Sequence, residues 1–211
     1  MKIAILGGTG RMGIGLATSY ARARHEVIVG SRDPARAAVC AARISGQVPE
    51  ARVRGEDLKT SAGEADFVVL AVPFHDVTRL VAAMLDQLSG KTIVDITNPF
   101  GAVPVGKISG VEHNAKALRR EARWVAAYKT NFWKTLSVPV DGRGVQRQVF
   151  ICSDDADAKD AVSRLVESTG FRPIDCGALE NARVLDPMVP LMLELDRRYG
   201  GDSASGWAFL D

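Results

Sequence analysis

The chain has 211 residues, of which 46% are hydrophobic and 25% charged, an ordinary globular composition that can bury a sizeable core. Its net charge of +2 is too weak for a nucleic-acid binder, which usually presents a clustered basic face. No apolar run approaches the roughly 20 residues that span a bilayer, and Met1-Lys2 leads straight into an apolar segment without a secretory signal. We therefore expect a cytoplasmic protein with no nucleic-acid and no membrane partner.

Strands and helices are predicted to alternate along the first 138 residues. Short apolar runs, such as KIAIL at 2–6 and DFVVLAV at 66–72, are typical of buried parallel strands. Further strands are predicted at 26–30, 52–54, 91–96 and 124–127, and helices at 13–23, 34–44, 57–62, 77–88 and 114–118. Because parallel strands need helical crossovers, the pattern predicts an α/β fold with a Rossmann-like, doubly wound, mostly parallel sheet.

The C-terminal third repeats the pattern, with strands predicted at 148–152 and 172–175 around a helix at 156–168. A closing helix is predicted at 179–199, and Pro187 and Pro190 are expected to kink or split it. Its expected apolar stripe consists of Val184, Met188, Leu191, Met192 and Leu195. The tail residues Trp207, Phe209 and Leu210 are expected to be buried.

No linker is long or polar enough to separate two independent domains. We expect residues 1–138 to form a Rossmann domain and residues 139–211 to form a βαβ-plus-helix extension packed on the sheet edge. The three cysteines, Cys40, Cys152 and Cys176, form no CxxC pair and have no histidine at ligand spacing. They are expected to be reduced thiols, and no metal site is predicted.

A glycine-rich loop follows the first strand and opens the first helix. Its sequence, Gly8-Thr9-Gly10-Arg11-Met12-Gly13, matches the dinucleotide-binding fingerprint. Gly8 permits the tight turn, Gly10 lets the pyrophosphate approach the backbone, and Gly13 lets the helix pack close to the strands. The helix N-terminus then presents free N–H groups and a partial positive charge to the phosphates, so this loop predicts a dinucleotide site.

The end of the second strand predicts which dinucleotide binds. An NAD-binding protein usually places an acidic residue there, to accept hydrogen bonds from the ribose 2′-OH. In this chain the strand ends at Ser31-Arg32, and Arg36 follows about one helical turn later. A guanidinium donates a forked pair of hydrogen bonds to a phosphate, and a serine hydroxyl adds another. The sequence therefore predicts NADP(H) rather than NAD(H).

Three later strand ends are expected to line the same crevice, because ligands bind open α/β sheets at the carboxyl ends of the strands. Ala71, Val72 and Pro73 follow the fourth strand, and Asn98 follows the fifth. Ala127, Lys129 and Thr130 follow the sixth. These residues are predicted to meet the nicotinamide half of the dinucleotide or its redox partner, whereas His75 is expected to be a surface or capping residue.

Catalytic motifs are absent from the sequence. It contains no GxSxG, no HExxH and no P-loop lysine, which argues against hydrolysis. No catalytic histidine or tyrosine–lysine pair stands out, and no catalytic residue is assigned. Hydride transfer between two cofactors needs little beyond orientation and exclusion of water, so the absence favours that reaction.

On these residues the chain resembles the NADP oxidoreductases that use the deazaflavin coenzyme F420, a superfamily that includes the cytosolic domain of STEAP-type metalloreductases. The resemblance covers nearly the whole chain. It rests on Gly7 to Gly10 with Gly13, Gly30-Ser31-Arg32, Ala71-Val72-Pro73, and a more specific C-terminal segment. That segment is Gly170-Phe171-Arg172-Pro173-Ile174-Asp175-Cys176-Gly177 with Leu179, Asn181, Ala182, Arg183 and Leu185.

The resemblance implies hydride transfer between C4 of the nicotinamide and C5 of the deazaflavin, with no protein acid or base in that step. The two rings would stack in a cleft between the sheet edge and the C-terminal lobe. By position, Thr9, Ser31, Arg32 and Arg36 would hold the 2′-phosphate and pyrophosphate. Val72 and Pro73 would meet the nicotinamide riboside, and residues 127–130 the nicotinamide face.

Three alternatives remain open at the level of the sequence. A flavin could replace the deazaflavin as the second redox partner. The chain could instead be an NADPH-binding sensor without turnover, or a reductase of a small imine or carbonyl with Lys129 as the proton donor. The apolar closing helix and the tail aromatics also predict a homodimer.

Overall fold

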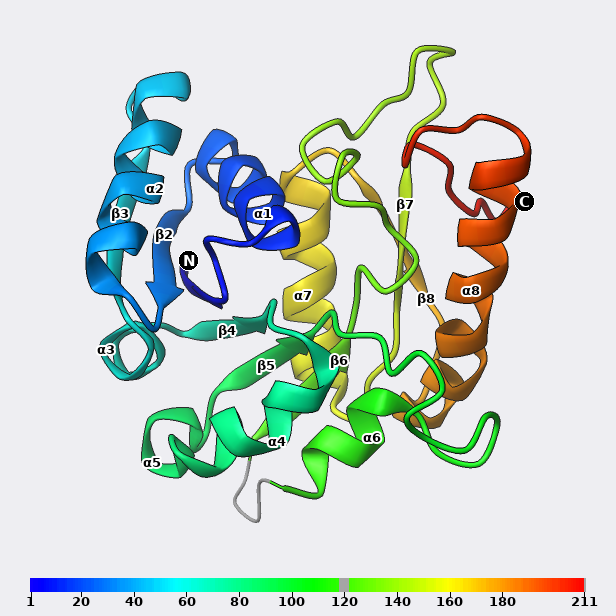
Figure 1. Cartoon of the computed structure of the whole chain (residues 1–211), viewed down its shortest axis with the longest axis horizontal. Coiled ribbons are helices and arrows are strands. Elements are labelled where there is room, and N and C mark those ends of the chain that lie inside the picture. Colours follow the sequence, from blue (N-terminus) through cyan, green and yellow to red (C-terminus); the bar gives the residue numbers. More distant parts are fainter. Residues whose placement is uncertain (118–121, 211) are drawn as a thin grey trace.

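Apolar strands and connecting helices alternate in the computed structural model, which describes residues 1–117 and 122–210 (Figure 1). The strands of the main sheet are β1 (Lys2–Leu6), β2 (Glu26–Ser31), β3 (Arg52–Asp57), β4 (Phe67–Leu70), β5 (Thr92–Asp95) and β6 (Arg123–Ala126). All six are parallel and lie in the order β3-β2-β1-β4-β5-β6. The order reverses between β1 and β4, where a doubly wound sheet opens a ligand crevice.

Helices cover both faces of this sheet. One face packs on α1 (Arg11–Arg22), α2 (Pro34–Gln47) and α7 (Ala156–Ser168). The other packs on α3 (Leu58–Glu64), α4 (Phe74–Ala82), α5 (Leu85–Leu88) and α6 (Gly110–Ala115). Successive strand residues point to opposite faces, so Ile3 and Ile5 join the first core while Leu6 joins the second. The doubly wound α/β fold predicted from the sequence is confirmed.

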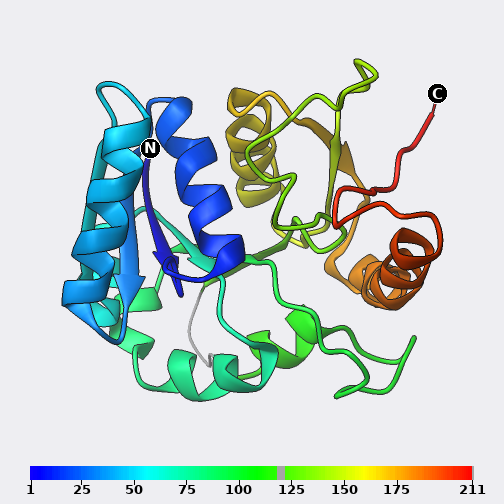
Figure 2. The same cartoon turned by 45° about the horizontal axis from the view of Figure 1, so that its top comes forward.

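The C-terminal extension is built around a second, two-stranded parallel sheet of β7 (Gln148–Ile151) and β8 (Arg172–Asp175). Ala126 and Cys152 join it to β6 through an antiparallel bridge, with N···O distances of 2.9 and 3.1 Å. A short 3₁₀ turn, η1 (Leu179–Asn181), then leads into α8 (Ala182–Arg198). Figure 2 shows β7, β8 and α8 as a lobe beside the Rossmann sheet. The division at residue 138 into a Rossmann domain and a dependent C-terminal extension remains a prediction.

Two predicted helices differ from the observed ones. The helix expected at 77–88 begins earlier, at Phe74, and is interrupted because Met84 has non-helical dihedral angles. The helix expected at 114–118 is α6, which starts at Gly110 because Ser109 and Glu112 form a capping box there. Residue 118 of that prediction lies outside the described residues.

The closing helix also differs from its prediction. α8 is not split at Pro187 or Pro190, and it runs from Ala182 to Arg198. The predicted stripe is wrong in part, because Val184 and Leu191 are exposed. The buried residues of α8 are Ala182, Leu185, Asp186, Val189, Met192 and Asp196.

The expectation of a buried tail is wrong for Phe209 and Leu210, whose residues are 53% and 84% exposed. Backbone contacts attach the tail instead. The Gln148 side chain accepts a hydrogen bond from the Phe209 N–H at 2.7 Å and donates one to the Phe209 carbonyl at 2.9 Å. Within the described residues, no helix is long and apolar enough to cross a membrane.

Candidate functional site

The loop between β1 and α1 owes its shape to its glycines. Gly7 has a φ of +86°, and a Cβ there would lie 2.5 Å from the Ala71 carbonyl oxygen. A Cβ on Gly13 would lie 2.6 Å from the Gly7 carbonyl oxygen, so only glycine allows α1 to sit this close to the loop. A Cβ on Gly10 would meet only the Gly7 oxygen, at 3.3 Å. The fold therefore demands Gly13 but leaves open space beside Gly10.

A cavity of about 540 Å³, the phosphate cleft, opens beside this loop. It is lined by Gly7, Thr9, Gly10, Ser31, Arg32, Asp33, Arg36, Leu58, Ala71, Val72, Pro73, Asp76, Arg79, Leu80 and Ala83. Gly10 is the N-cap of α1 and provides no side-chain cap, so the first-turn N–H groups of α1 are open to a ligand. This combination fits the pyrophosphate of a dinucleotide.

The cations of the phosphate cleft are available for a second phosphate. Within residues 1–117 and 122–210, neither the Arg32 nor the Arg36 guanidinium forms an ion pair or hydrogen bond. The Asp33 carboxylate caps α2 by accepting from the Arg36 N–H at 3.1 Å. The buried Ser31 hydroxyl oxygen accepts from the Asp33 N–H at 3.1 Å, which leaves its O–H free to donate. These groups fit a 2′-phosphate.

Sequence reasoning missed Arg79 at the rim of the phosphate cleft. It lies on α4 and pairs with Asp76 one turn earlier, at 2.5 Å. Leu58 and Leu80 supply apolar walls from α3 and α4. The sequence does contain a signal for Arg79. Asp76 and Arg79 are three residues apart in the helix that begins after Pro73, close to the end of β4.

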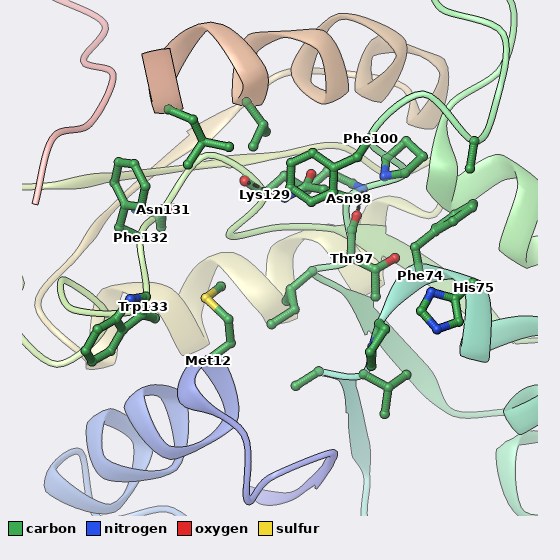
Figure 3. A pocket seen from close by; sticks show the side chains of 18 of the residues that line it. Met12, Phe74, His75, Thr97, Asn98, Phe100, Lys129, Asn131, Phe132 and Trp133 are labelled. Atoms are coloured by element: carbon green, nitrogen blue, oxygen red, sulfur yellow. Dashed lines mark hydrogen bonds between the residues drawn. The ribbon is translucent and has the colours of Figure 1, made fainter. Parts of the chain in front are cut away.

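A second cavity of about 520 Å³, the apolar cleft, shares Ala71, Val72 and Pro73 with the first. Figure 3 shows Met12 of α1 on one side of it, Phe132 and Trp133 at one end, Phe74 at the other, and Phe100 between these ends. Val189, Met192 and Leu193 of α8 also line it. Aromatic and aliphatic walls of this kind suit a flat ring system.

Two asparagines provide polar atoms to the apolar cleft. The Asn98 amide donates to the Lys129 carbonyl, and the Asn131 amide donates to the Gln148 carbonyl, both at 3.0 Å. The Oδ1 atom of each asparagine is buried without a hydrogen-bond partner in the described part of the chain. A buried acceptor without a partner is costly, so a ring N–H or carboxamide N–H fits here.

Lys129 is a buried residue that contacts two other elements. Its side chain is fully buried, and its Nζ donates to the Thr97 carbonyl and lies 3.0 Å from Asp186 Oδ1. Asp186 Oδ2 in turn accepts from the Gly110 N–H at 2.7 Å. Lys129 thus joins the ends of β5 and β6 to α8 and lines the apolar cleft between Asn131 and Asn98 (Figure 3).

Some predicted site residues do not line either cavity, namely Gly8, Arg11, Gly13, Ala127 and Thr130. Gly8 and Gly13 shape the loop, Ala127 and Thr130 are buried, and the Arg11 guanidinium lies 5.4 Å from the centre of the Trp133 ring. The cleft residues that sequence reasoning missed include Phe74, Phe100, Val189 and Met192, which come from three distant segments. His75 is exposed, as expected.

Comparisons with known proteins agree with this geometry. The family model described as NADP oxidoreductase, coenzyme F420-dependent, matches residues 2–99. The F420-dependent NADP reductase of Methanothermobacter marburgensis is 35% identical over 208 residues, which are 93% of this chain and 92% of that protein. The chain belongs to this family. The membership confirms the family expected from the sequence, and with it an NADP-dependent oxidoreductase.

Two further proteins resemble this chain over different shares of their own length. A crystal structure described as a candidate F420-dependent NADP reductase from Arthrobacter sp. FB24 covers 100% of both chains, with a TM-score of 0.85 and 31% identity. Metalloreductase STEAP3 of Rattus norvegicus is 32% identical over 194 residues, but these are only 37% of that protein. The similarity to the Arthrobacter structure includes the C-terminal lobe, which lies outside the residues matched by the family model.

Proposed function

We propose that this chain transfers a hydride between NADP(H), bound along the phosphate cleft, and the deazaflavin coenzyme F420, whose ring enters the apolar cleft. The junction of the two cavities at Ala71, Val72 and Pro73 carries the proposal. A nicotinamide that reaches this junction from the phosphate cleft has one face open to the apolar cleft. The cofactors supply the hydride chemistry, and the protein supplies orientation and exclusion of water.

Residue roles follow from this arrangement. Gly10 and the N-terminus of α1 bind the pyrophosphate, and Ser31, Arg32 and Arg36 bind the 2′-phosphate. Asn98 Oδ1 and Asn131 Oδ1 accept hydrogen bonds from the rings in the apolar cleft. Lys129 is occupied by Asp186 and the Thr97 carbonyl, which disfavours a role as proton donor to an imine or carbonyl. No protein group acts as acid or base in the hydride step.

A cytoplasmic homodimer is the second part of the proposal. The three cysteines are free thiols, as is usual in a reducing compartment. Exposed apolar side chains on α8 and the tail, among them Leu191 and Leu210, support a contact between two copies. The division into a Rossmann domain, residues 1–138, and an extension, residues 139–211, belongs to the same proposal.

A spectrophotometric assay tests the reaction. Purified protein is mixed with NADPH and oxidised F420, and in parallel with NADPH and FMN or FAD, and the loss of the visible absorption band is followed. We expect rapid bleaching of F420 and little bleaching of either flavin. Tight NADPH binding without bleaching of any acceptor would contradict the proposal and favour a sensor. Rapid bleaching of FMN or FAD without bleaching of F420 would contradict the deazaflavin assignment and identify a flavin as the hydride acceptor.

A further inference from the structure

Two of the three cysteines lie side by side at the ends of neighbouring strands, outside both clefts. Cys152 follows β7 and Cys176 follows β8, and the parallel register of these strands pairs Ile151 with Asp175 directly before them. The Cys176 N–H donates to the Ile151 carbonyl at 2.8 Å, which extends the pairing to the cysteines. Neighbouring strands lie about 4.8 Å apart, within the ~4.4–6.8 Å between Cα atoms that a disulfide spans.

The two thiols already contact each other. The Cys176 thiol donates to the Ile174 carbonyl at 3.5 Å, and its sulfur also interacts with Cys152. The interaction with Cys152 is the main reason that the pKa of Cys176 falls to about 7, although burial and the Asp175 carboxylate oppose the shift. The same interaction and burial raise the pKa of Cys152. Cys176 is therefore the better nucleophile of the pair, since the thiolate is the reactive form.

Accessibility divides the pair in the same way. Cys176 is partly exposed, whereas Cys152 is fully buried. A reagent in solution thus reaches Cys176 first, and Cys152 lies behind it. The segment after Cys176 turns at Gly177, which has a φ of +81°, and leads through η1 into α8.

We propose that Cys152 and Cys176 form a reversible redox site, in which an external low-molecular-weight disulfide converts the two thiols into an intramolecular disulfide. This inference does not depend on the proposed hydride transfer. A cross-link here would join the ends of β7 and β8 directly before the chain enters α8, one wall of the apolar cleft.

The reaction balances in two exchange steps. The Cys176 thiolate attacks one sulfur of the external disulfide, forms a mixed disulfide and releases one small thiolate. Cys152 then loses its proton and attacks the Cys176 sulfur, which releases the second small thiolate. Two electrons and two protons pass from the protein to the external disulfide, which leaves as two thiols, and dithiothreitol reverses the change.

The test uses glutathione disulfide as the probe and Cys40 as an internal control. Cys40 is buried and its burial raises the pKa of its thiol, so it should not react. After incubation, free thiols are alkylated and the protein is digested with trypsin, which cuts between the pair at Lys159 and Arg164. We expect a Cys152–Cys176 cross-linked peptide pair, an alkylated Cys40, and recovery of three alkylated thiols after reduction.

Variants separate the two roles. Cys152→Ala should stop at a glutathione adduct on Cys176, Cys176→Ser should not react, and Cys40→Ser should cross-link like the unmodified chain. Circular dichroism checks that each variant is folded, and the result on the unmodified chain needs no variant. Three alkylatable thiols after oxidation, a persistent glutathione adduct, or a disulfide that involves Cys40 would each overturn the proposal.

Discussion

Gly10 and Gly13 lie in the same loop, but they lack side chains for different reasons. A Cβ on Gly13 would collide with the loop backbone at 2.6 Å, whereas a Cβ on Gly10 would meet a single atom, the Gly7 carbonyl oxygen, at 3.3 Å. We expect Gly10→Val to fold with an almost unchanged melting temperature and to lose both NADPH and NADH binding, because it fills the space of the pyrophosphate. Thermal unfolding and cofactor titration measure the two effects.

Gly13→Val is the matched comparison at the residue scale. It should lower the melting temperature strongly, because backbone atoms of Gly7 and Gly8 cannot move aside cheaply. Normal cofactor binding by Gly10→Val would show that the loop is not the phosphate site.

Arg32 is predicted to select NADP over NAD. Arg32→Glu removes a forked donor and puts a negative charge against the 2′-phosphate, while NADH presents only a hydroxyl there. Because a hydrogen bond to a charged group contributes about 1.5–3 kcal/mol, we expect a roughly 10- to 100-fold loss of NADPH affinity and little change for NADH. Arg43→Glu makes the same charge change on the exposed part of α2, outside the phosphate cleft. Equal losses for both cofactors in Arg32→Glu would refute the selection.

At the scale of elements, α6 is attached to α8 by an ion pair. The Arg183 guanidinium donates to both Glu112 carboxylate oxygens, at 2.5 and 2.9 Å, and Ser109 donates to Oε2 from its N–H and hydroxyl. Arg183 is the main cause that lowers the pKa of Glu112 from 4.5 to about 2. A lowered folded-state pKa adds stability that is present above pH ~4.5 and is lost as the pH falls towards ~2.

Glu112→Gln should therefore lower the free energy of unfolding at pH 7 by about 1–2 kcal/mol. The effect is no larger because solvent screens a partly exposed ion pair. The difference in the free energy of unfolding between this variant and the unmodified chain should shrink between pH 5 and 2, because Glu112 becomes protonated in that range. Urea unfolding at a series of pH values measures both trends. A constant difference across this range would show that the Glu112 charge adds nothing.

The same elements show how far the sequence predicts the fold. Buried strands such as 2–6 and 148–151 can be predicted from the sequence, because they are short runs of mostly apolar residues. The exposed positions of Val184 and Leu191 were not predictable, because the buried face of α8 depends on where Asp186 meets Lys129 and Gly110. For the site, local spacing predicted Gly10 and Arg32, whereas the apolar cleft joins segments that are far apart in the sequence.

At the scale of the whole molecule, the two lobes meet at the apolar cleft, and α8 forms the outer wall of the C-terminal lobe (Figure 1). The side of α8 that turns away from the core carries apolar side chains, and Leu191 is 51% exposed there. Phe209 and Leu210, in the tail that comes after α8 in the chain, are also exposed. Single exposed apolar residues are common, but several on one lobe favour a protein contact.

Light scattering coupled to size-exclusion chromatography tests whether that contact joins two copies. We expect the unmodified chain to have twice the monomer mass and Leu191→Asp to have the monomer mass, because a carboxylate cannot be buried cheaply at an apolar interface. The melting temperature of the Leu191→Asp monomer should fall only by the contribution of the lost interface. Val39→Asp is the control, since Val39 is 72% exposed on α2 in the other lobe and should leave the dimer intact. A dimer that survives Leu191→Asp but dissociates in Val39→Asp would move the interface to the Rossmann lobe.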